Sequence, residues 1–477
     1  MFDLSKFQDH IGQLPSLKTY THLLLSFPMS DGYFQRAAAI HALYAATEAL
    51  ITDFPWLAAE VKHEGRAPGN SGTFRLQSCP SSRPEDLVIV RDASDLCPSY
   101  KELHAARGPC SMLPVRTLGP VVCFPEQYED SSLQPARVFV MQANFIRGGL
   151  LLDLAAQHNS IDDMGLHQCA RLLAKALRHE PFSPLELDQG NRDRRQLIPL
   201  LHDQDDGPEP VLDPSHLRHN NKSAPFSLSP NPQALRPPAQ WHHFHIPAHH
   251  LAKIHDRATK DLTTHAPKLQ RHQRPLAGPT APASYISTTD TLCAFLWHHL
   301  SAARHLSPSQ RTQFSRSIDA RRVLGIPAAY MGQMTHTATV SLTYRDLRAM
   351  NLGETAAGLR DRRVEVDTEY AVRSWATVLA QTRDKSRIML EGESEYDRLA
   401  DVRVCSLEHA GLDSCVFGAL GRPGLVRRPG SEPLEGGVHF WEGSEDGGVE
   451  MMVCLGKGEV EALRGDEGWS EVVEFVG

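Results

Sequence analysis

The chain has 477 residues, of which 41% are hydrophobic and 22% charged, with 33 glycines and 33 prolines. This composition is typical of a globular protein and excludes fibrous and disordered classes, and the length favours two or three domains. The formal net charge of −8 argues against a nucleic-acid partner, because phosphate binding relies on clustered lysines and arginines.

Membrane and export signals are not evident in the sequence. No apolar stretch reaches the roughly 20 residues that span a bilayer. The N-terminal sequence MFDLSKFQDHIGQLPS has no basic region followed by an apolar core, as a signal peptide would. The cysteines are odd in number and none forms a C-x-x-C pair, which indicates reduced thiols and a cytoplasmic protein. The nine cysteines are Cys79, Cys97, Cys110, Cys123, Cys169, Cys293, Cys405, Cys415 and Cys454.

Apolar spacing predicts the elements of the first part of the chain. Residues 34–61 show helical spacing up to Asp53, where Phe54-Pro55 ends the helix. Residues 86–92 form a short strand, and residues 136–158 form two strands around the turn at 147–149. A helix then starts after the pair Asp162-Asp163, so that His158 lies in a strand-to-helix loop.

The composition changes between residues 183 and 240, which are rich in Pro, Asp, Asn, Ser and His. We interpret this stretch as a crossover between domains, and residues 266–285 as a surface loop. Residues 286–306 begin with the capping signal Ser-Thr-Thr-Asp and continue as an apolar helix. Residues 436–469 predict two strands around a Gly-rich turn and a short final helix. The predicted domains are therefore 1–182 and 241–477, joined by the linker 183–240.

The stretch AAQHNSIDDMGL, residues 155–166, places one histidine close to two carboxylates. His158 with Asp162 or Asp163 is compatible with a metal site, with a general base and a structural partner, or with a solvated turn. Loops that a rigid scaffold holds often carry functional side chains, which favours a functional reading.

A metal site is the weaker reading of this stretch. Catalytic zinc usually takes three protein ligands, and the chain contains no H-E-x-x-H motif. The histidine-rich WHHFHIPAHH, residues 241–250, lies beside the proline-rich linker and is typical of the start of a strand followed by a polar turn. We therefore predict no metal.

The H-x-x-x-D of His158 and Asp162 resembles the motif of the acyl-CoA-dependent acyltransferase superfamily, which contains plant BAHD enzymes and trichothecene O-acetyltransferase-like fungal enzymes. Four further stretches are similar to family segments in the right order, so the resemblance covers nearly the whole chain. They are ISTTDTLCAFLW (286–297), SIDARRVLGIPAAYMGQ (317–333), VFGALGRPGLVRRPG (416–430) and the closing DGGVEMMVCLGKGEVEALRGDEGW (446–469).

The residues fit acyl transfer on chemical grounds as well. Moving an acyl group from a thioester to a hydroxyl requires a base for the alcohol proton, and imidazole has a suitable pKa near neutral pH. We predict that His158 is this base and that no covalent enzyme intermediate forms. The resemblance implies an active-site channel between two domains. It also implies that Asp162 turns away from this channel and pairs with Arg321, which makes both residues structural.

For acyl-CoA, the start of the helix near residue 290 is the candidate. Ser287, Thr288 and Thr289, with the free N–H groups of the helix, would hold a phosphate. The alternative is that Thr288 or Thr289 is an ordinary capping residue. Basic contacts to CoA are open among Arg422, Arg427 and Arg428.

Two departures from the family pattern stand out. Asp163 occupies a position where many relatives carry Gly. VFGALGRP lacks the Asp and the Trp of the D-F-G-W-G found in plant enzymes, and the nearest upstream carboxylate is Asp413. The family uses that segment mainly for architecture, so no oxyanion donor is assigned from it.

These inferences predict an α/β fold of two similar sheet-and-helix domains of the chloramphenicol acetyltransferase-like type, with a channel at their interface. The expected function is transfer of an acyl group, most simply acetyl, from CoA to a hydroxyl of a hydrophobic secondary metabolite such as a terpenoid, alkaloid or polyketide. Acyl-CoA is a co-substrate, no cofactor is bound, and a monomer suffices. The alternatives are N-acylation of an amine, a silent metabolite-binding relative, and a metal-dependent hydrolase using His158 and Asp162.

Overall fold

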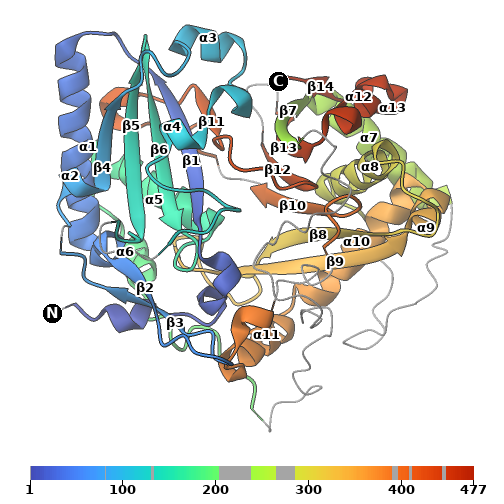
Figure 1. The fold of residues 1–477 in the computed structure, drawn as a ribbon, viewed down its shortest axis with the longest axis horizontal. Coiled ribbons are helices and arrows are strands. Elements are labelled where there is room, and N and C mark those ends of the chain that lie inside the picture. The colour runs from blue at the N-terminus through green and yellow to red at the C-terminus, as the bar shows by residue number, and fades with distance from the viewer. Residues whose placement is uncertain are drawn as a thin grey trace.

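A computed structural model describes residues 2–80, 82–129, 134–202, 238–264, 285–388, 396–407, 411–442 and 447–477. These residues form two sheet-and-helix halves that stand side by side (Figure 1). The predicted α/β class with two mixed halves is confirmed. Most of the predicted linker and most of the predicted loop 266–285 lie outside the described residues, and the domain boundaries remain a prediction.

The first half is built on a sheet with the strand order β11-β1-β6-β5-β4, in which only β4 and β5 run parallel among the described pairs. Its strands are β11 (Leu425–Arg427), β1 (Tyr20–Pro28), β6 (Gly149–Gln157), β5 (Phe139–Ile146) and β4 (Val88–Asp92), and β2 (Glu60–Glu64) pairs with β3 (Thr73–Gln77) beside them. Its helices are α1 (Tyr33–Asp53), α2 (Pro84–Leu87), α3 (Tyr100–Ala105), α4 (Val115–Leu118), α5 (Asp163–Leu177) and α6 (Pro184–Gly190).

The predicted elements around His158 are confirmed. The helix expected to end near Asp53 is α1, the paired strands expected over 136–158 are β5 and β6, and the helix after the Asp pair is α5. The strand expected over 86–92 is β4, which starts at Val88 because α2 occupies the residues before it.

Strand β6 explains the continuous apolar run that precedes His158. Every residue of β6 is buried, because α1 and α5 cover one face of the sheet and the segment around α3 and α4 covers the other. A strand that is covered on both faces has no reason to alternate polar and apolar residues. The one carboxylate in the strand, Asp153, is buried and pairs with Nδ1 of His22 at 2.7 Å.

One segment of the second half belongs physically to the first half. Strand β11 pairs antiparallel with β1, with Val426 opposite Leu25. Upstream of it, Leu412, Phe417 and Leu420 are buried in the core between α1, α5 and the first sheet. The chain between residues 411 and 430 therefore ties the two halves together.

The second half contains a sheet with the strand order β14-β7-β13-β12-β10-β8-β9. Its strands are β14 (Glu474–Phe475), β7 (Gln240–Ile246), β13 (Val449–Leu455), β12 (Gly437–Glu442), β10 (Val402–Leu407), β8 (Arg311–Asp319) and β9 (Thr335–Thr343). Its helices are α7 (Ala248–Thr264), α8 (Thr288–Ala303), α9 (Tyr344–Ala349), α10 (Leu352–Val366), α11 (Glu369–Gln381), α12 (Lys457–Gly465) and α13 (Glu467–Ser470).

The two faces of this second sheet have different partners. Helices α7, α8 and α10 lie on the side away from the first half (Figure 1), and their apolar residues form one core with the strands. On the other face Trp241, Trp441 and Met452 cluster with Cys110 of the first half, and Met164 of α5 packs against them. The start of α5 is therefore inserted between the halves. Among the described residues, no helix combines the length and apolar character needed to cross a membrane.

The histidine-rich stretch 241–250 has a structural explanation. Its first part is strand β7, as predicted. The polar turn predicted for its second part is wrong, because His249 and His250 belong to the start of helix α7. His243 contacts the buried Glu450 at 2.8 Å. Arg107, from the first half, contacts the same carboxylate at 3.3 Å, so a buried charge cluster joins the halves.

This cluster predicts an acid-sensitive contribution to stability. Burial by itself would raise the pKa of Glu450, but the His243 hydrogen bond and the nearby Arg427 outweigh it and lower the pKa to about 2. Since the folded-state pKa lies below the ordinary value of 4.5, the stabilisation is complete above pH 4.5 and is lost as the pH falls toward 2. We expect it to amount to about 3 kcal/mol.

Urea denaturation of the wild type and of Glu450→Gln between pH 7 and pH 3 measures this contribution. The variant is expected to be less stable at pH 7 and to lose less stability on acidification. Glu461→Gln, on the exposed face of α12, is the control. Equal acid sensitivity of Glu450→Gln and the wild type would contradict the assignment.

Candidate active site

His158 follows the last residue of β6 and stands where the two halves meet. Its backbone N–H donates to the Thr19 carbonyl at 2.8 Å, and its own carbonyl accepts from Nε2 of Gln333 at 3.0 Å. Thr19 directly precedes β1 in the first half, and Gln333 lies just before β9 in the second. The backbone at His158 is therefore fixed from both sides, while its side chain is partly exposed.

The hydrogen bond of the imidazole defines its tautomer. Nδ1 lies 3.2 Å from the carbonyl oxygen of Ile161. A carbonyl oxygen only accepts, so Nδ1 carries the proton and Nε2 of the neutral ring keeps its lone pair. A backbone carbonyl here does the orienting work that a carboxylate does in a Ser-His-Asp triad. His158 is thus arranged to accept a proton at Nε2.

The carboxylate of Asp162 is buried and points toward Arg321. It is 2% exposed and forms a two-pronged ion pair with Arg321, at 2.8 Å and 2.9 Å. The same carboxylate accepts from the backbone N–H groups of Gly165 and Met334, each at 2.8 Å. Asp162 therefore caps α5 and at the same time binds the loop before β9.

Arg321 uses its whole guanidinium in this arrangement. Besides Asp162, it donates to the carbonyls of Tyr330 and Gly332, at 3.1 Å and 2.8 Å, and to Asp319 at 2.7 Å. A guanidinium has five N–H groups, and each finds an acceptor here. The structure thus brings Arg321 together with Asp162, which lies four residues after His158 in the same loop.

Asp163, the unexplained departure from the family pattern, also has a cationic partner. Its side chain is 17% exposed and lies 2.5 Å from Nη2 of Arg428. The thiol of Cys405, on β10, donates to its other oxygen at 3.1 Å. Burial alone would raise the pKa of Asp163, but the positive charge of Arg428, an electrostatic interaction with His158 and the hydrogen bond from the Cys405 thiol hold it well below its ordinary value.

The three arginines considered for CoA have different surroundings. Arg428 is buried and committed to Asp163, and Arg427 is buried with hydrogen bonds to the carbonyls of Arg107, Gly108 and Val426. Arg422 is exposed. Of the three, only Arg422 presents its charge to solvent.

The residues predicted to bind CoA lie at the start of α8. The hydroxyl of Ser287 accepts from Asp290 N at 3.1 Å, and the backbone N–H of Ser287 donates to the Asp290 carboxylate at 2.9 Å, which completes a capping box. Thr288 is exposed and Thr289 half-buried. Among the described residues no hydrogen bond or ion pair joins this helix start to His158, Asp162 or Arg321.

The segment VFGALGRP, which replaces the family's D-F-G-W-G, is held in place by backbone geometry. Phe417 is fully buried and makes an edge contact with Phe27, at 5.3 Å between ring centroids. Gly418 has a φ of +56°, and a Cβ there would lie 2.3 Å from the carbonyl oxygen of Leu177 in α5. The segment thus keeps an architectural role although it lacks the Asp and the Trp of D-F-G-W-G.

We expect Gly418→Ala to destabilise the protein more than Gly411→Ala. Both glycines have a φ of +56°, in the left-handed region, so alanine at either position should destabilise the folded backbone by about 1–2 kcal/mol. Only Gly418 is crowded, since a Cβ at Gly411 meets nothing within 4 Å. The clash should add about 1–3 kcal/mol, measured as a larger fall in melting temperature. Equal losses in the two variants would show that the contact with Leu177 relaxes freely.

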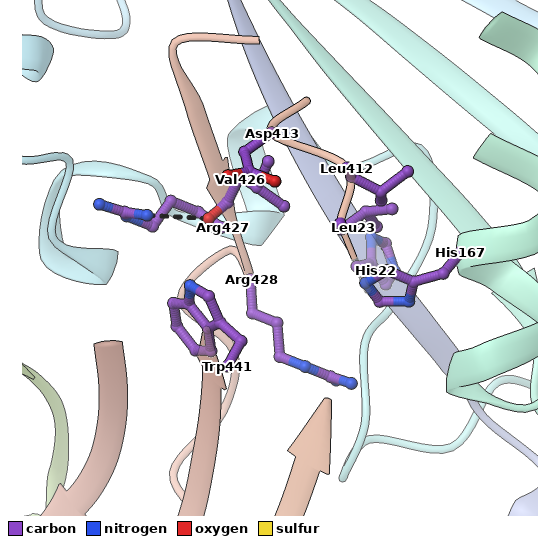
Figure 2. A pocket seen from close by; sticks show the side chains of 10 residues that line it. His22, Leu23, His167, Leu412, Asp413, Val426, Arg427, Arg428 and Trp441 are labelled. Carbon is purple, nitrogen blue, oxygen red and sulfur yellow. Dashed lines mark hydrogen bonds between the residues drawn. The ribbon is translucent and has the colours of Figure 1, made fainter. Parts of the chain in front are cut away.

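A small cavity of about 40 Å³ lies beside Arg428, the partner of Asp163 (Figure 2). Figure 2 shows Arg428 between the indole of Trp441 and the two imidazoles of His22 and His167, while Arg427 points the other way. Asp413, whose role was open, is on the cavity wall. Because Arg428 contacts Asp163, the cavity wall and the His158 loop share one ion pair.

Several contacts of the site were not predicted. Gln333, which holds the His158 carbonyl, and Asp319, which flanks Arg321, both lie in the stretch 317–333 that carries the family resemblance, so the signal was present. Cys405 and the pairing of Arg428 with Asp163 have no local signal, because their elements meet only in the fold. Within the described part of the chain, no group of three or more His, Cys, Asp or Glu side chains is placed to hold a metal ion.

Comparison with known proteins agrees with this geometry. The family model for the trichothecene 3-O-acetyltransferase-like N-terminal domain matches residues 19–177, and that for the transferase family matches residues 122–468. The O-acetyltransferase epaC of Aspergillus niger is 38% identical over 100% of this chain and 98% of its own length. The O-acyltransferase pigD of Monascus ruber is 36% identical, with 100% of each chain covered.

Solved structures give the same result. Fusarium graminearum TRI101, complexed with coenzyme A and deoxynivalenol, superposes with a TM-score of 0.85 at 28% identity, covering 98% of this chain and 99% of TRI101. The resemblance stated from the motifs is confirmed. The chain therefore belongs to the transferase family, in its fungal trichothecene 3-O-acetyltransferase-like branch, and is an acyl-CoA-dependent acyltransferase.

Proposed function

We propose that this chain transfers an acetyl group from acetyl-CoA to a hydroxyl of a hydrophobic secondary metabolite, with His158 as the general base. Support comes from relatives named as O-acetyltransferases and from a solved relative that holds coenzyme A with a small-molecule acceptor. The observation that carries the role of His158 is its tautomer, since the Ile161 carbonyl leaves Nε2 ready to accept a proton.

The reaction then needs no covalent enzyme intermediate. Nε2 of His158 takes the hydroxyl proton while the alcohol oxygen attacks the thioester carbonyl and the carbonyl electrons move to oxygen. Collapse of this tetrahedral intermediate breaks the carbon–sulfur bond, and the imidazolium returns its proton to the CoA thiolate. Asp162 and Arg321 touch neither substrate in this scheme. Their role is to keep the His158 loop in position.

Thiol release from acetyl-CoA tests the proposed function. The purified protein is incubated with pooled hydroxylated terpenoids, alkaloids and polyketides, and the products are identified by mass. Release that depends on an acceptor, with a product heavier by one acetyl group, is the expected result. The same pools with amines in place of hydroxyls test N-acylation. Tight CoA binding without any release would instead favour the silent binding relative.

The start of α8 is retained as the proposed contact to the CoA phosphates. The capping box occupies the Ser287 hydroxyl, so the proposal depends on Thr288, Thr289 and the free N–H groups of the first turn. Thr288→Glu is expected to raise the KM for acetyl-CoA several-fold with little change in kcat, because it places a negative charge where a phosphate would bind. The exposed Thr52, near the end of α1, supplies the control Thr52→Glu. An unchanged KM in Thr288→Glu would exclude this helix start.

The proposal includes a monomer in the cytoplasm. None of the nine cysteines forms a disulfide, as a reducing compartment requires. Sedimentation analysis and localisation of a tagged protein test these two points.

A further inference from the structure

We propose that Asp163 and Arg428 form a positioning pair that sets the electrostatic environment of His158, a role that rests on the proposed function of His158 as base. The Asp163 carboxylate is bound on one side by an arginine and on the other by a thiol.

The pair occupies the junction of the two halves. Asp163 is the first residue of α5, directly after Asp162, and Arg428 directly follows β11. Cys405 approaches from β10, so three separate segments meet at one carboxylate. Asp163 is thereby fixed in the helix start that ends the loop beginning at His158. An electrostatic interaction with His158 is also one of the causes that lower the pKa of Asp163.

The other titratable groups around Asp163 are neutral in the working pH range. Burial lowers the pKa of His167 to about 4 and that of His439 to about 3, and it raises the pKa of the Cys405 thiol well above 9. Arg428 stays protonated, since its ion pair with Asp163 outweighs the cost of burial and raises its pKa. Burial likewise raises the pKa of Cys123 to about 12, and the buried His22–Asp153 pair beside Arg428 is the same in every variant. Of the two described side chains that bind the Asp163 carboxylate, Arg428 and Cys405, only Arg428 is therefore charged.

Removing each partner should act on His158 in opposite directions. Asp163→Asn leaves an uncompensated positive charge, which disfavours a protonated imidazole and weakens the base. Arg428→Met leaves an uncompensated negative charge, which favours the protonated imidazole. The Asp162–Arg321 ion pair beside the loop is the same in both variants, so it adds a constant background. If the ion pair only held the fold together, removing either partner would have the same effect, and the protonation of His158 would not shift in opposite directions in the two variants.

The test is the pH dependence of kcat/KM for thiol release in wild type, Asp163→Asn, Arg428→Met and the double variant. The acid-side midpoint is expected to fall in Asp163→Asn and to rise in Arg428→Met, each by about 0.5 pH unit or more, the size expected for one nearby, partly screened charge. The double variant should return close to the wild-type midpoint. Arg428→Lys, which keeps the charge, should keep the midpoint even if it lowers the melting temperature.

Midpoints that stay unchanged, or that move in the same direction in the two single variants, would overturn the proposal. A readout without turnover separates this failure from a failure of the proposed function. In ¹³C-histidine-labelled protein the His158 signal, assigned by its loss in His158→Ala, is titrated by NMR in the same variants. Opposite shifts of that signal would support the pair even if no acceptor were turned over, and absent shifts would reject it.

Discussion

Replacement of His158 with alanine is expected to lower the rate of acceptor-dependent thiol release by about 10²- to 10⁴-fold, the usual contribution of a positioned general base. The loss should appear in kcat, because the proton transfer belongs to the transition state and not to substrate binding. The fold should survive. Among the described residues, the His158 side chain makes one hydrogen bond, to the Ile161 carbonyl, and the contacts that hold its backbone to Thr19 and Gln333 do not involve the ring.

The measurement combines three readouts on the same preparation: kcat and KM with a productive acceptor, the melting temperature, and the Kd for CoA by calorimetry. His41→Ala is the matched control, since His41 is an exposed histidine on α1. A folded His158→Ala protein that binds CoA and still turns over at the wild-type rate would remove His158 from the mechanism. Parallel loss of melting temperature and activity would assign His158 a structural role.

The His158 loop could be predicted from the sequence because its determinants are local. The apolar run of β6, the polar HNSIDD and the helical spacing of α5 follow one another directly along the chain. The pairing of Asp162 with Arg321 joins residues that are distant in sequence, and it was available only through the resemblance. The contacts that complete it come from backbone carbonyls at Tyr330 and Gly332, and backbone groups carry no sequence signal.

The surroundings of Asp163 could not be predicted for a different reason. The sequence shows only a second aspartate directly after Asp162, and this alone has no interpretation. Its meaning depends on Arg428, which reaches it because β11 leaves the second half and pairs with β1 in the first. A three-residue strand that crosses to the other sheet is too short for periodicity to reveal. The same crossing explains how VFGALGRP keeps its place without the family's Asp and Trp.

Asp162→Asn is expected to destabilise the protein by up to about 3–5 kcal/mol, because it removes one of the two carboxylates that neutralise the buried guanidinium of Arg321 and leaves only the partly exposed Asp319. Arg321→Met should destabilise the protein by a similar amount, since it leaves the buried carboxylate of Asp162 without its cationic partner. The double variant should cost clearly less than the sum, because each single change removes the same interaction. Arg195→Met is the control. The side chains of Arg195 and of its partner Asp193 are 51% and 48% exposed, so their ion pair should contribute less than about 1 kcal/mol.

Activity measured beside stability separates a brace from a catalytic group. If Asp162 is structural, the two single variants lose activity in parallel with melting temperature, and the shape of the pH profile is retained at a temperature where they remain folded. Cooling should then recover part of the activity, because the folded loop still presents Nε2 of His158. If Asp162 took part in proton transfer, Asp162→Asn would stay inactive when fully folded, while Arg321→Met would recover. The difference between these two variants therefore determines which of the paired residues, if either, acts on the reaction itself.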